Sequence, residues 1–403
     1  MTTRAISLTI ALLSGLAVAN SFAAVNPADE RLQFLEQRVQ ADPMDCVAQN
    51  GLSWACVLAM RQTGDLSYLN RAAQAARASL AAVPAAQNPG GLVALSMAQF
   101  ESHHFQEALT LARQARVIDP LNTGALATMG DAELELGDYS EAENLYANLS
   151  EQGPVPSVQA RLSRLAEIKG ENEKAIALLR EAATGENAEW YHIRLGEIFF
   201  RIGQFEEAEC EYAAAQKLAP DHFLVREHFA ELRAAQGRYA DAIHLYEQVV
   251  SRVPRPDYFQ ALGDVYTFQG KPAEAKPWYD KALAGYLKSV EQGNAHYFHH
   301  LAGFYSDSME NPAAAIRWAR KDLEVRHSVY AHDSLAWAHY KNGDFTSAIG
   351  EIKQALSMGT QDAHLLFHAA MIFSCAGQLD RGDELLKQAM SIDPKYNSFH
   401  VHR

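Results

Sequence analysis

Apolar and polar residues follow a helical period through most of the chain. Over stretches of about 12 to 15 residues, apolar side chains recur at positions i, i+3, i+4 and i+7, which places them on one face of an α-helix. Convincing alternation of apolar and polar residues, which would mark a half-buried strand, is missing from the sequence. The pattern therefore predicts an all-α protein built from amphipathic helices, with no sheet.

A longer pattern repeats about every 34 residues. Each copy has a small residue in its first helix, an alanine about twelve positions later, an aromatic residue or leucine four positions after that, and often a proline. Small residues let two antiparallel helices approach closely, and proline cannot continue the second helix. Three clear copies are Met129-Gly130…Ala142…Tyr146…Pro154, Leu195-Gly196…Ala208…Tyr212…Pro220 and Phe229-Ala230…Ala242…Tyr246…Pro254.

A glycine followed by a polar residue separates the two helices of most copies. Glycine accepts the left-handed backbone conformation that commonly ends a helix, so each glycine is expected to stop the first helix and allow the chain to reverse. The seven turns of this kind start at Gly137, Gly170, Gly203, Gly237, Gly270, Gly343 and Gly377.

This pattern resembles the tetratricopeptide repeat family, whose signature runs Trp-x-x-Leu-Gly-x-x-Tyr…Ala-x-x-x-Phe…Pro over 34 residues. The resemblance covers about ten copies, from roughly Ser53 to Pro394. It implies a right-handed superhelical solenoid of about ten helix-turn-helix repeats, which binds proteins or peptides on its concave face. Departures are local: His192, His299 and His332 fill the position of the first Trp.

The resemblance also suggests how the chain is divided. Residues 24–52 match the repeat poorly and are expected to cap the apolar face of the first repeat. The repeat array is expected over 53–394, followed by a tail at 395–403. The copy that starts near Pro256 is some six residues longer than the others, which predicts extended helices around residues 282–293.

The first 23 residues have the pattern of an export signal. Arg4 gives a positive start, residues 6–19 are almost wholly apolar, and Ser21-Phe22-Ala23 is a small-x-small cleavage site. The apolar run of about 14 residues is too short to span a bilayer. Because no cysteine lies near the cleavage point to carry a lipid, we predict a periplasmic or secreted protein.

Composition, charge and motifs argue against several classes of function. The 403 residues include 35 Lys and Arg against 49 Asp and Glu, and this acidic balance argues against nucleic-acid binding. After the signal, no stretch reaches the roughly 18 apolar residues of a membrane span. The sequence contains no His-Glu-x-x-His, Gly-x-Ser-x-Gly or phosphate-loop motif. We therefore expect a non-catalytic protein without a cofactor, and the oligomeric state stays open.

Histidines suggest an alternative function. Ten of the sixteen lie at or after His296, and two i, i+4 pairs place both rings on one helical face, where they could hold Zn²⁺ or Cu²⁺. Structural metal sites usually recruit cysteine or carboxylate ligands as well. No metal site is assigned on this basis, but a metal-binding or metal-handling periplasmic protein remains the second hypothesis. Its candidate ligands are His296, His300, His364 and His368.

The resemblance assigns the lining of the concave face to positions 2, 5, 9 and 12 of each repeat. Family members that clamp a C-terminal carboxylate use Lys and Asn there, whereas positions 5 and 9 of this chain hold neither. The lining instead has an acidic part, made of Glu197, Glu227, Glu231, Asp257 and Asp264. It continues into a predicted protein-binding groove, made of Tyr297, His300, Phe304, Tyr330, Asp333, Trp337, Tyr340, His364, Phe367 and Met371.

Two interpretations of the aromatic lining remain open. Aromatic residues and methionine give a large contact area at low ordering cost and dominate binding hot spots, which favours a protein or peptide segment with apolar anchors and a basic flank. Alternatively, these side chains fill the interior of a tightly wound superhelix or contact the neighbouring repeat. On the first interpretation the chain is a scaffold or adaptor of the cell envelope.

Overall fold

The computed structural model describes residues 27–151, 153, 155–185, 187–395 and 399. Throughout this part of the chain the regular elements are helices and no strand occurs, which confirms the all-α prediction. The predicted signal peptide at 1–23 lies outside the described residues. The α-helices are α1 (Pro27–Ala41), α2 (Cys46–Thr63), α3 (Ser67–Ala82), α4 (Pro89–Glu101), α5 (Phe105–Ile118), α6 (Thr123–Glu135), α7 (Tyr139–Ser150), α8 (Pro156–Ile168), α9 (Asn172–Ala182), α10 (Ala188–Arg201), α11 (Phe205–Leu218), α12 (Phe223–Ala235), α13 (Tyr239–Arg252), α14 (Pro256–Phe268), α15 (Pro272–Glu291), α16 (Phe298–Gly303), α17 (Pro312–Val325), α18 (Val329–Lys341), α19 (Phe345–Ala355), α20 (Ala363–Cys375) and α21 (Leu379–Ile392).

Two short helices complete the set: the 3₁₀ helix η1 (Ala85–Gln87) and the π-helix η2 (Phe304–Ser308). From α2 onward the α-helices form ten successive antiparallel pairs, α2/α3 to α20/α21, among the described residues. Helix α1 precedes the first pair, and its Leu32 and Leu35 are buried in a cluster with Cys56 of α2. The expected boundary between cap and repeats, at residues 52 and 53, falls inside α2.

The glycine turns behave as the sequence predicts. All seven glycines have a positive φ, between 73° and 83°, and Gly64 forms the same turn in the first pair. In two of these turns the next residue, Asp138 or Asp344, caps the second helix: the Asp138 side chain accepts a hydrogen bond from the Glu141 N–H at 3.0 Å, which satisfies a donor left open at the helix start.

The small residue of each repeat allows the two helices of a pair to touch. A Cβ atom added to Gly130 would lie 2.5 Å from the Tyr146 ring, and one added to Gly263 would lie 2.5 Å from the Tyr279 ring. The tyrosine is the aromatic residue of the Ala-x-x-x-aromatic pattern. Glycine and tyrosine of one repeat therefore form a single packing contact, which explains why they recur together.

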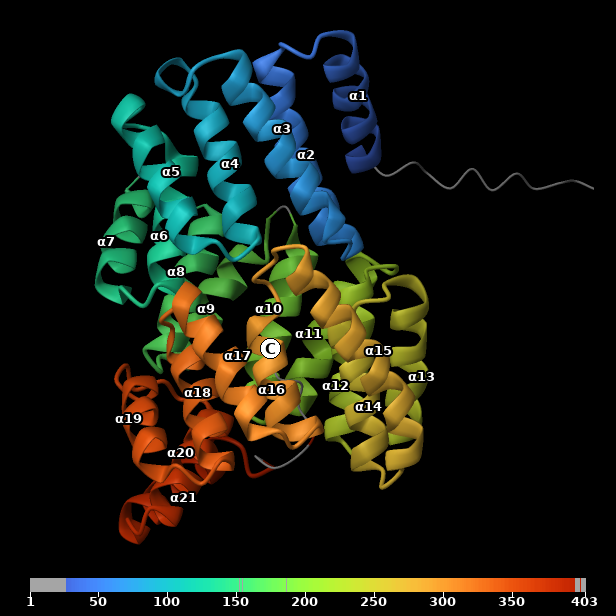
Figure 1. The fold of residues 1–403 in the computed structure, drawn as a ribbon, viewed down its shortest axis with the longest axis vertical. Helices are drawn as coiled ribbons and strands as arrows, with labels where there is room; N and C mark the ends of the chain where they lie inside the picture. Colours follow the sequence, from blue (N-terminus) through green and yellow to red (C-terminus); the bar gives the residue numbers. More distant parts are fainter. Residues whose placement is uncertain (1–26, 152, 154, 186, 396–398, 400–403) are drawn as a thin grey trace, which may run out of the picture.

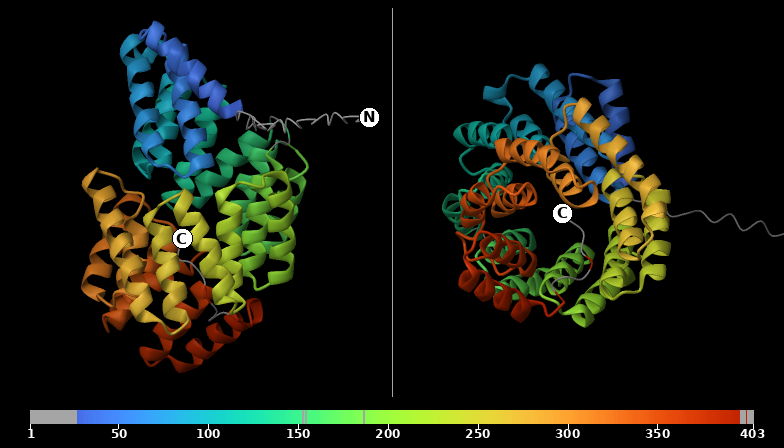
Figure 2. Two further views of the ribbon diagram at one scale, coloured as in Figure 1. Left: turned by 90° about the vertical axis from the view of Figure 1, so that its right-hand side faces the viewer. Right: turned by 60° about the horizontal axis from the view of Figure 1, so that its bottom comes forward.

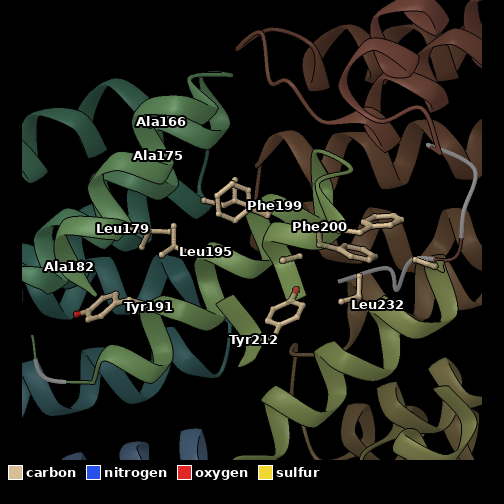
Figure 3. Close-up of a cluster of buried hydrophobic side chains, with 14 residues drawn as sticks. Ala166, Ala175, Leu179, Ala182, Tyr191, Leu195, Phe199, Phe200, Tyr212 and Leu232 are labelled. Carbon is tan, nitrogen blue, oxygen red and sulfur yellow. The ribbon is translucent and has the colours of Figure 1, made fainter. Parts of the chain in front are cut away.

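Apolar side chains between successive helices form a continuous core. Figure 3 shows one part of it, where Leu179 of α9, Leu195 of α10, Tyr212 of α11 and Leu232 of α12 are buried together. Burial of a large apolar side chain stabilises a fold by about 1.5–3 kcal/mol. Each pair shares its core with the next pair, so the array is held together along its whole length.

The pairs wind into a right-handed superhelix, with the first helix of each pair on the inside and the second on the outside (Figure 1, Figure 2). The winding is tight enough that successive superhelical turns touch. The turn within each of the first five pairs meets the chain that follows the pair five places further on. The five meeting points join Gly64 to Val253, His103 to His296, Gly137 to His327, Gly170 to Gly359, and Gly203 to Asp393.

Hydrogen bonds reinforce these meeting points. The His327 N–H donates to the Glu135 carbonyl at 3.0 Å, and the Val329 N–H donates to the Tyr139 hydroxyl at 2.8 Å. The Thr360 hydroxyl likewise donates to the Ile168 carbonyl at 2.5 Å. The superhelix is thus closed by specific contacts between residues about 190 positions apart in the chain.

The predicted extension after residue 282 is present, because α15 runs for 20 residues to Glu291. Among the four cysteines, Cys56 is buried, whereas Cys210 and Cys375 are exposed. In the part of the chain that the structure describes, no helix has the length and apolar content needed to cross a membrane.

Candidate functional site

The predicted lining residues lie on or next to the first helices, which form the inner layer of the superhelix (Figure 2). The acidic residues come from α10, α12 and α14. The residues of the predicted groove come from the segment around α16 and η2 and from α18 and α20. Their exposure differs strongly, and it decides which of them can meet a partner.

Tyr297 and Phe304 correct the sequence-based groove. Their exposed fractions are 2% and 0%, because both rings are packed in the core shared by α15, α16 and α17. The Tyr297 ring lies 5.1 Å from the Tyr286 ring, on the extra length of α15. The Phe304 ring also lies 6.0 Å from Tyr286. Counting positions at 34-residue spacing does not include the extra length of α15, which supplies Tyr286 as a packing partner for both rings.

Seven of the predicted groove residues are half-buried, and four of these form what we term the aromatic surface: Trp337 and Tyr340 of α18, with Phe367 and Met371 of α20. The Trp337 and Tyr340 rings stack at 4.7 Å, and Phe367 lies 6.4 Å from Trp337. The indole N–H of Trp337 donates to Asp307 at 3.0 Å. This bond fixes the indole of Trp337 before any partner arrives.

Asp333, His364 and His368 support the aromatic surface from below. His368 is buried and stacks on Trp337 at 3.9 Å, and its Nδ1 is 3.1 Å from both carboxylate oxygens of the buried Asp333. The His364 ring meets His368 edge-on at 4.0 Å. These three residues orient the indole ring, and the partner-facing role predicted for Asp333 is not compatible with its burial.

Tyr330 and His300 take part in other contacts. The guanidinium of Arg164 lies 5.2 Å above the Tyr330 ring. This contact joins α8 to α18, which lie on neighbouring superhelical turns. His300 lies against Tyr297 and Tyr286, close to the meeting point of His103 with His296. Both residues therefore contribute to the closure of the superhelix, as the second interpretation of the lining suggested.

The candidate metal ligands can now be compared in space. The His296 and His300 rings are 6.3 Å apart and nearly parallel, and burial lowers the pKa of each to about 3, with the positive charge of Arg255 and Arg326 as a further cause. Across the described residues, no group of three or more His, Cys, Asp or Glu side chains is arranged to hold a metal ion.

The acidic residues of α10 and α12 form a second distinct site, which we term the acidic cluster: Glu197, Glu227 and Glu231. All three surround the buried His228, at 3.0 Å from Glu197 to Nε2 and at 3.8 and 3.9 Å from Glu227 and Glu231 to Nδ1. Glu197 also pairs with Arg194. Glu227 and Glu231 are buried, although they lie on an inner helix. Three carboxylates around one imidazole give this site a strongly acidic character.

Asp257 and Asp264 of α14 differ from each other in charge. Burial alone would raise the pKa of Asp257, but Arg255 at 2.8 Å lowers it below its ordinary value. Burial raises the pKa of Asp264 to about 7, while hydroxyl groups of Tyr279 and Ser308 donate to it at 2.8 and 2.9 Å. Ser308 and Asp307 follow each other in η2, so the π-helix links Asp264 directly to Trp337.

One polar centre and the contacts of η2 were not expected from the sequence. Glu167 of α8 is buried and contacts Arg164 at 3.5 Å, Arg194 at 3.3 Å, and Arg201. Burial favours a raised pKa for Glu167, but the three guanidinium groups lower it overall. The available signal was Arg164, three residues before Glu167 on α8, together with Arg194 and Arg201, seven residues apart on α10. No local pattern marks the π-helix.

Comparisons with known proteins agree with this architecture. Residues 99–165 and 229–288 each match a model of the tetratricopeptide repeat. The chain is 23% identical over 276 residues to the TPR repeat-containing protein YpiA of Bacillus subtilis, a match covering 66% of this chain and 61% of YpiA. A TPR repeat-containing protein of Treponema pallidum is 25% identical over 190 residues, or 46% of this chain and 23% of that protein.

The chain therefore spans less than two thirds of the length of either relative. Among solved structures, a human IFIT1 dimer with PPP-AAAA is 14% identical, with a TM-score of 0.49 over 90% of this chain and 86% of that one. The matched models, the ten helix pairs and the glycine–tyrosine contacts lead to one conclusion. The chain belongs to the tetratricopeptide repeat family.

Proposed function

We propose that the protein is a non-catalytic scaffold or adaptor of the cell envelope, and that it binds a protein or peptide segment on the inner face of its superhelix. The observation that carries this proposal is the aromatic surface. Its four side chains come from two adjacent first helices and are half-buried, and Trp337 is fixed by its hydrogen bond to Asp307. The location in the envelope rests on the export signal of the sequence.

The chemistry of the inner face suggests the kind of partner. An aromatic or aliphatic side chain of a partner gains contact area on Trp337 and Phe367 without ordering them, since they are already fixed by their neighbours. Glu227, Glu231 and Asp257 are buried, so a basic flank of the same segment would meet the acidic lining mainly at the half-buried Glu197. We therefore propose a partner segment with apolar anchors next to Lys or Arg.

Partner capture from envelope extract tests the proposal. The wild-type protein and a Trp337→Ala/Phe367→Ala variant are crosslinked to their partners, which mass spectrometry identifies and titration calorimetry then quantifies. We expect the double variant to lose at least about tenfold in affinity, because truncation of hot-spot aromatics costs about 2 kcal/mol or more. Circular dichroism would verify that helicity is kept.

Trp54→Ala is the matched control. Trp54 lies on α2 with 39% of its surface exposed, so its loss removes an equally large side chain away from the aromatic surface. A partner that binds all three proteins equally well would eliminate the aromatic surface as the site.

Metal handling by histidines is a second candidate with less support. The observation in its favour is that the buried Nδ1 atoms of His296 and His300 have no hydrogen-bond partner. Dialysis against Zn²⁺ or Cu²⁺, followed by elemental analysis, tests it. Retention of less than about half an equivalent would exclude this function.

A further inference from the structure

The contacts between superhelical turns join the turns within the first five pairs to the loops that follow the last five pairs, as at Gly64 and Val253. The loops that follow the first five pairs, and the turns within the last five, lie at the other ends of these helices and face away from the closing contacts. In Figure 1 the loop between α3 and α4 is near the top of the molecule, and the turn between α14 and α15 is near the bottom. We term these two free edges the N-terminal rim and the C-terminal rim.

The loop after α5, on the N-terminal rim, has the same form as a loop that makes a closing contact. It reads Ile118-Asp119-Pro120, and the loop after α21 reads Ile392-Asp393-Pro394. Asp119 and Asp393 end their helices with similar backbones, at φ −125° and ψ 90° against φ −132° and ψ 107°. Each carboxylate also accepts a hydrogen bond from the N–H two residues later. Asp393 uses this form to lie against Gly203, in the turn between α10 and α11.

The turns of the C-terminal rim likewise have the form of the turns that make closing contacts. Their φ angles lie between 75° and 82°, against 73° for Gly203, and their glycines are Gly237, Gly270, Gly343 and Gly377. A Cβ added to Gly203 would lie 2.5 Å from Asp393, whereas one added to any of these four meets no atom of the described residues within 4 Å. Both halves of the closing contact are therefore present a second time, on opposite rims.

Both rims carry exposed apolar side chains. On the N-terminal rim, Val117 and Leu121 lie on either side of the loop after α5, with exposed fractions of 82% and 83%, and the exposed Leu218 ends α11. On the C-terminal rim, Leu379 is exposed at the start of α21, and Met309 is exposed between η2 and α17. Removing these side chains from water would stabilise a contact between the two rims.

We propose that a second copy of this chain binds end to end, with its N-terminal rim on the C-terminal rim of the first copy. The contact repeats between copies the arrangement that already joins the superhelical turns within one copy, and thus continues an established interface. Because the two rims differ, the interface is heterologous and each copy keeps one rim open for the next. Such an association builds a chain of copies and not a closed dimer. It does not depend on partner binding at the inner face.

Sedimentation velocity tests the proposal on the protein without its predicted signal peptide, residues 24–403, at about 1 to 100 µM. We expect the average mass of the wild type to rise with concentration beyond that of a dimer. Val117→Glu/Leu121→Glu on the N-terminal rim, or Met309→Glu/Leu379→Glu on the C-terminal rim, should weaken association at least about tenfold, because each places charge in the interface. A wild type that stays monomeric throughout would overturn the proposal.

A mixture of the two rim variants distinguishes end-to-end binding from symmetric pairing. Each variant keeps one intact rim, and the two intact rims are complementary. The equimolar mixture should therefore form a 1:1 dimer with an affinity near that of the wild type, and nothing larger. A mixture that remains monomeric would contradict the proposal. Dimers formed by either variant alone would also contradict it, because they would show a rim that pairs with its own copy.

Met390→Glu is the matched control. Met390 is 47% exposed, but it lies near the end of α21 that leads to the closing contact at Gly203, and so belongs to neither rim. This variant should associate as the wild type does. Association weakened as much as in the rim variants would show a general effect of added charge and overturn the assignment to the rims. Circular dichroism would verify that all variants keep their helicity.

Discussion

His296 and His300 lie where the loop after α15 meets the turn between α4 and α5. The His296 ring is 4.5 Å from His103, whose pKa burial also lowers well below its ordinary value. All three imidazoles are therefore neutral at pH 7, and this meeting point between superhelical turns is built from uncharged rings. Their neighbours Arg255, Arg326, Asp257 and Asp322 carry the charge at the site.

Acidification should destabilise the fold through these histidines. The unfolded chain binds protons at the ordinary pKa near 6.5, whereas folded His296 and His300 bind them only near pH 3. The unfolded state therefore holds more protons between these values, so stability is lost as the pH falls below 6.5. We expect urea unfolding at pH 5 to show about 1–2 kcal/mol less stability per histidine than at pH 7. A His296→Gln/His300→Gln variant with the same pH profile would contradict this.

The titration of Asp264 should have the opposite effect to that of the histidines, because it lowers stability as the pH rises. Its pKa is about 7 in the folded state against 3.8 ordinarily, so the folded state holds the extra proton between these values and loses stability as the pH rises through them. Asp264→Asn cannot titrate. Relative to the wild type, this variant should gain roughly 2 kcal/mol between pH 5 and pH 8, measured from urea unfolding at both values. If the difference in free energy of unfolding between the two proteins is the same at pH 5 and pH 8, Asp264 is ionised in the folded state at both values.

At the scale of helices, the sequence predicts most of what the structure contains. The partners Gly130 and Tyr146 lie within one repeat, so the 34-residue pattern reveals their contact directly. The burial of Tyr297 and Phe304 could not be predicted in the same way. It depends on the extra length of α15, whose Tyr286 packs against both rings.

The glycine–tyrosine contact can be tested with two glycines. Gly130→Ala places a Cβ 2.5 Å from the Tyr146 ring and should cost about 1–3 kcal/mol of stability by overpacking. Gly350→Ala is the control, because Gly350 lies in α19 with no atom within 4 Å of the added Cβ. It should stabilise the helix by about 0.5–1 kcal/mol. Similar melting temperatures for both variants would refute the packing role.

At the scale of the whole molecule, the contacts between superhelical turns distinguish this chain from an open solenoid. Val329 and Tyr139 are 190 residues apart, and their contact depends on the sum of small rotations over five helix pairs. No local pattern specifies that sum. The inner location of the predicted lining could therefore be inferred from sequence, but which lining residues meet the next turn could not.

Alanine substitutions at Gly137 and Gly237 distinguish the free energy lost by straining a turn from the free energy lost by opening the superhelix. Both have a left-handed backbone, with φ of 83° and 75°. A Cβ on Gly137 would lie 2.5 Å from the His327 carbonyl oxygen, whereas one on Gly237 meets nothing within 4 Å. Gly137→Ala should therefore be about 1–3 kcal/mol less stable than Gly237→Ala. Small-angle scattering should show expansion of the Gly137 variant alone; equal radii would place the closure elsewhere.

The five meeting points also limit how a gene for this fold can change. In an open array, duplication or loss of one repeat only lengthens or shortens the molecule, because each repeat depends on its immediate neighbours. Here the turn between α6 and α7 is fitted to the chain that follows the pair five places further on. One repeat inserted between them would displace every later pair from its counterpart. Repeat number in such a protein is therefore inherited as a fixed property, and its descendants should vary in sequence far more readily than in length.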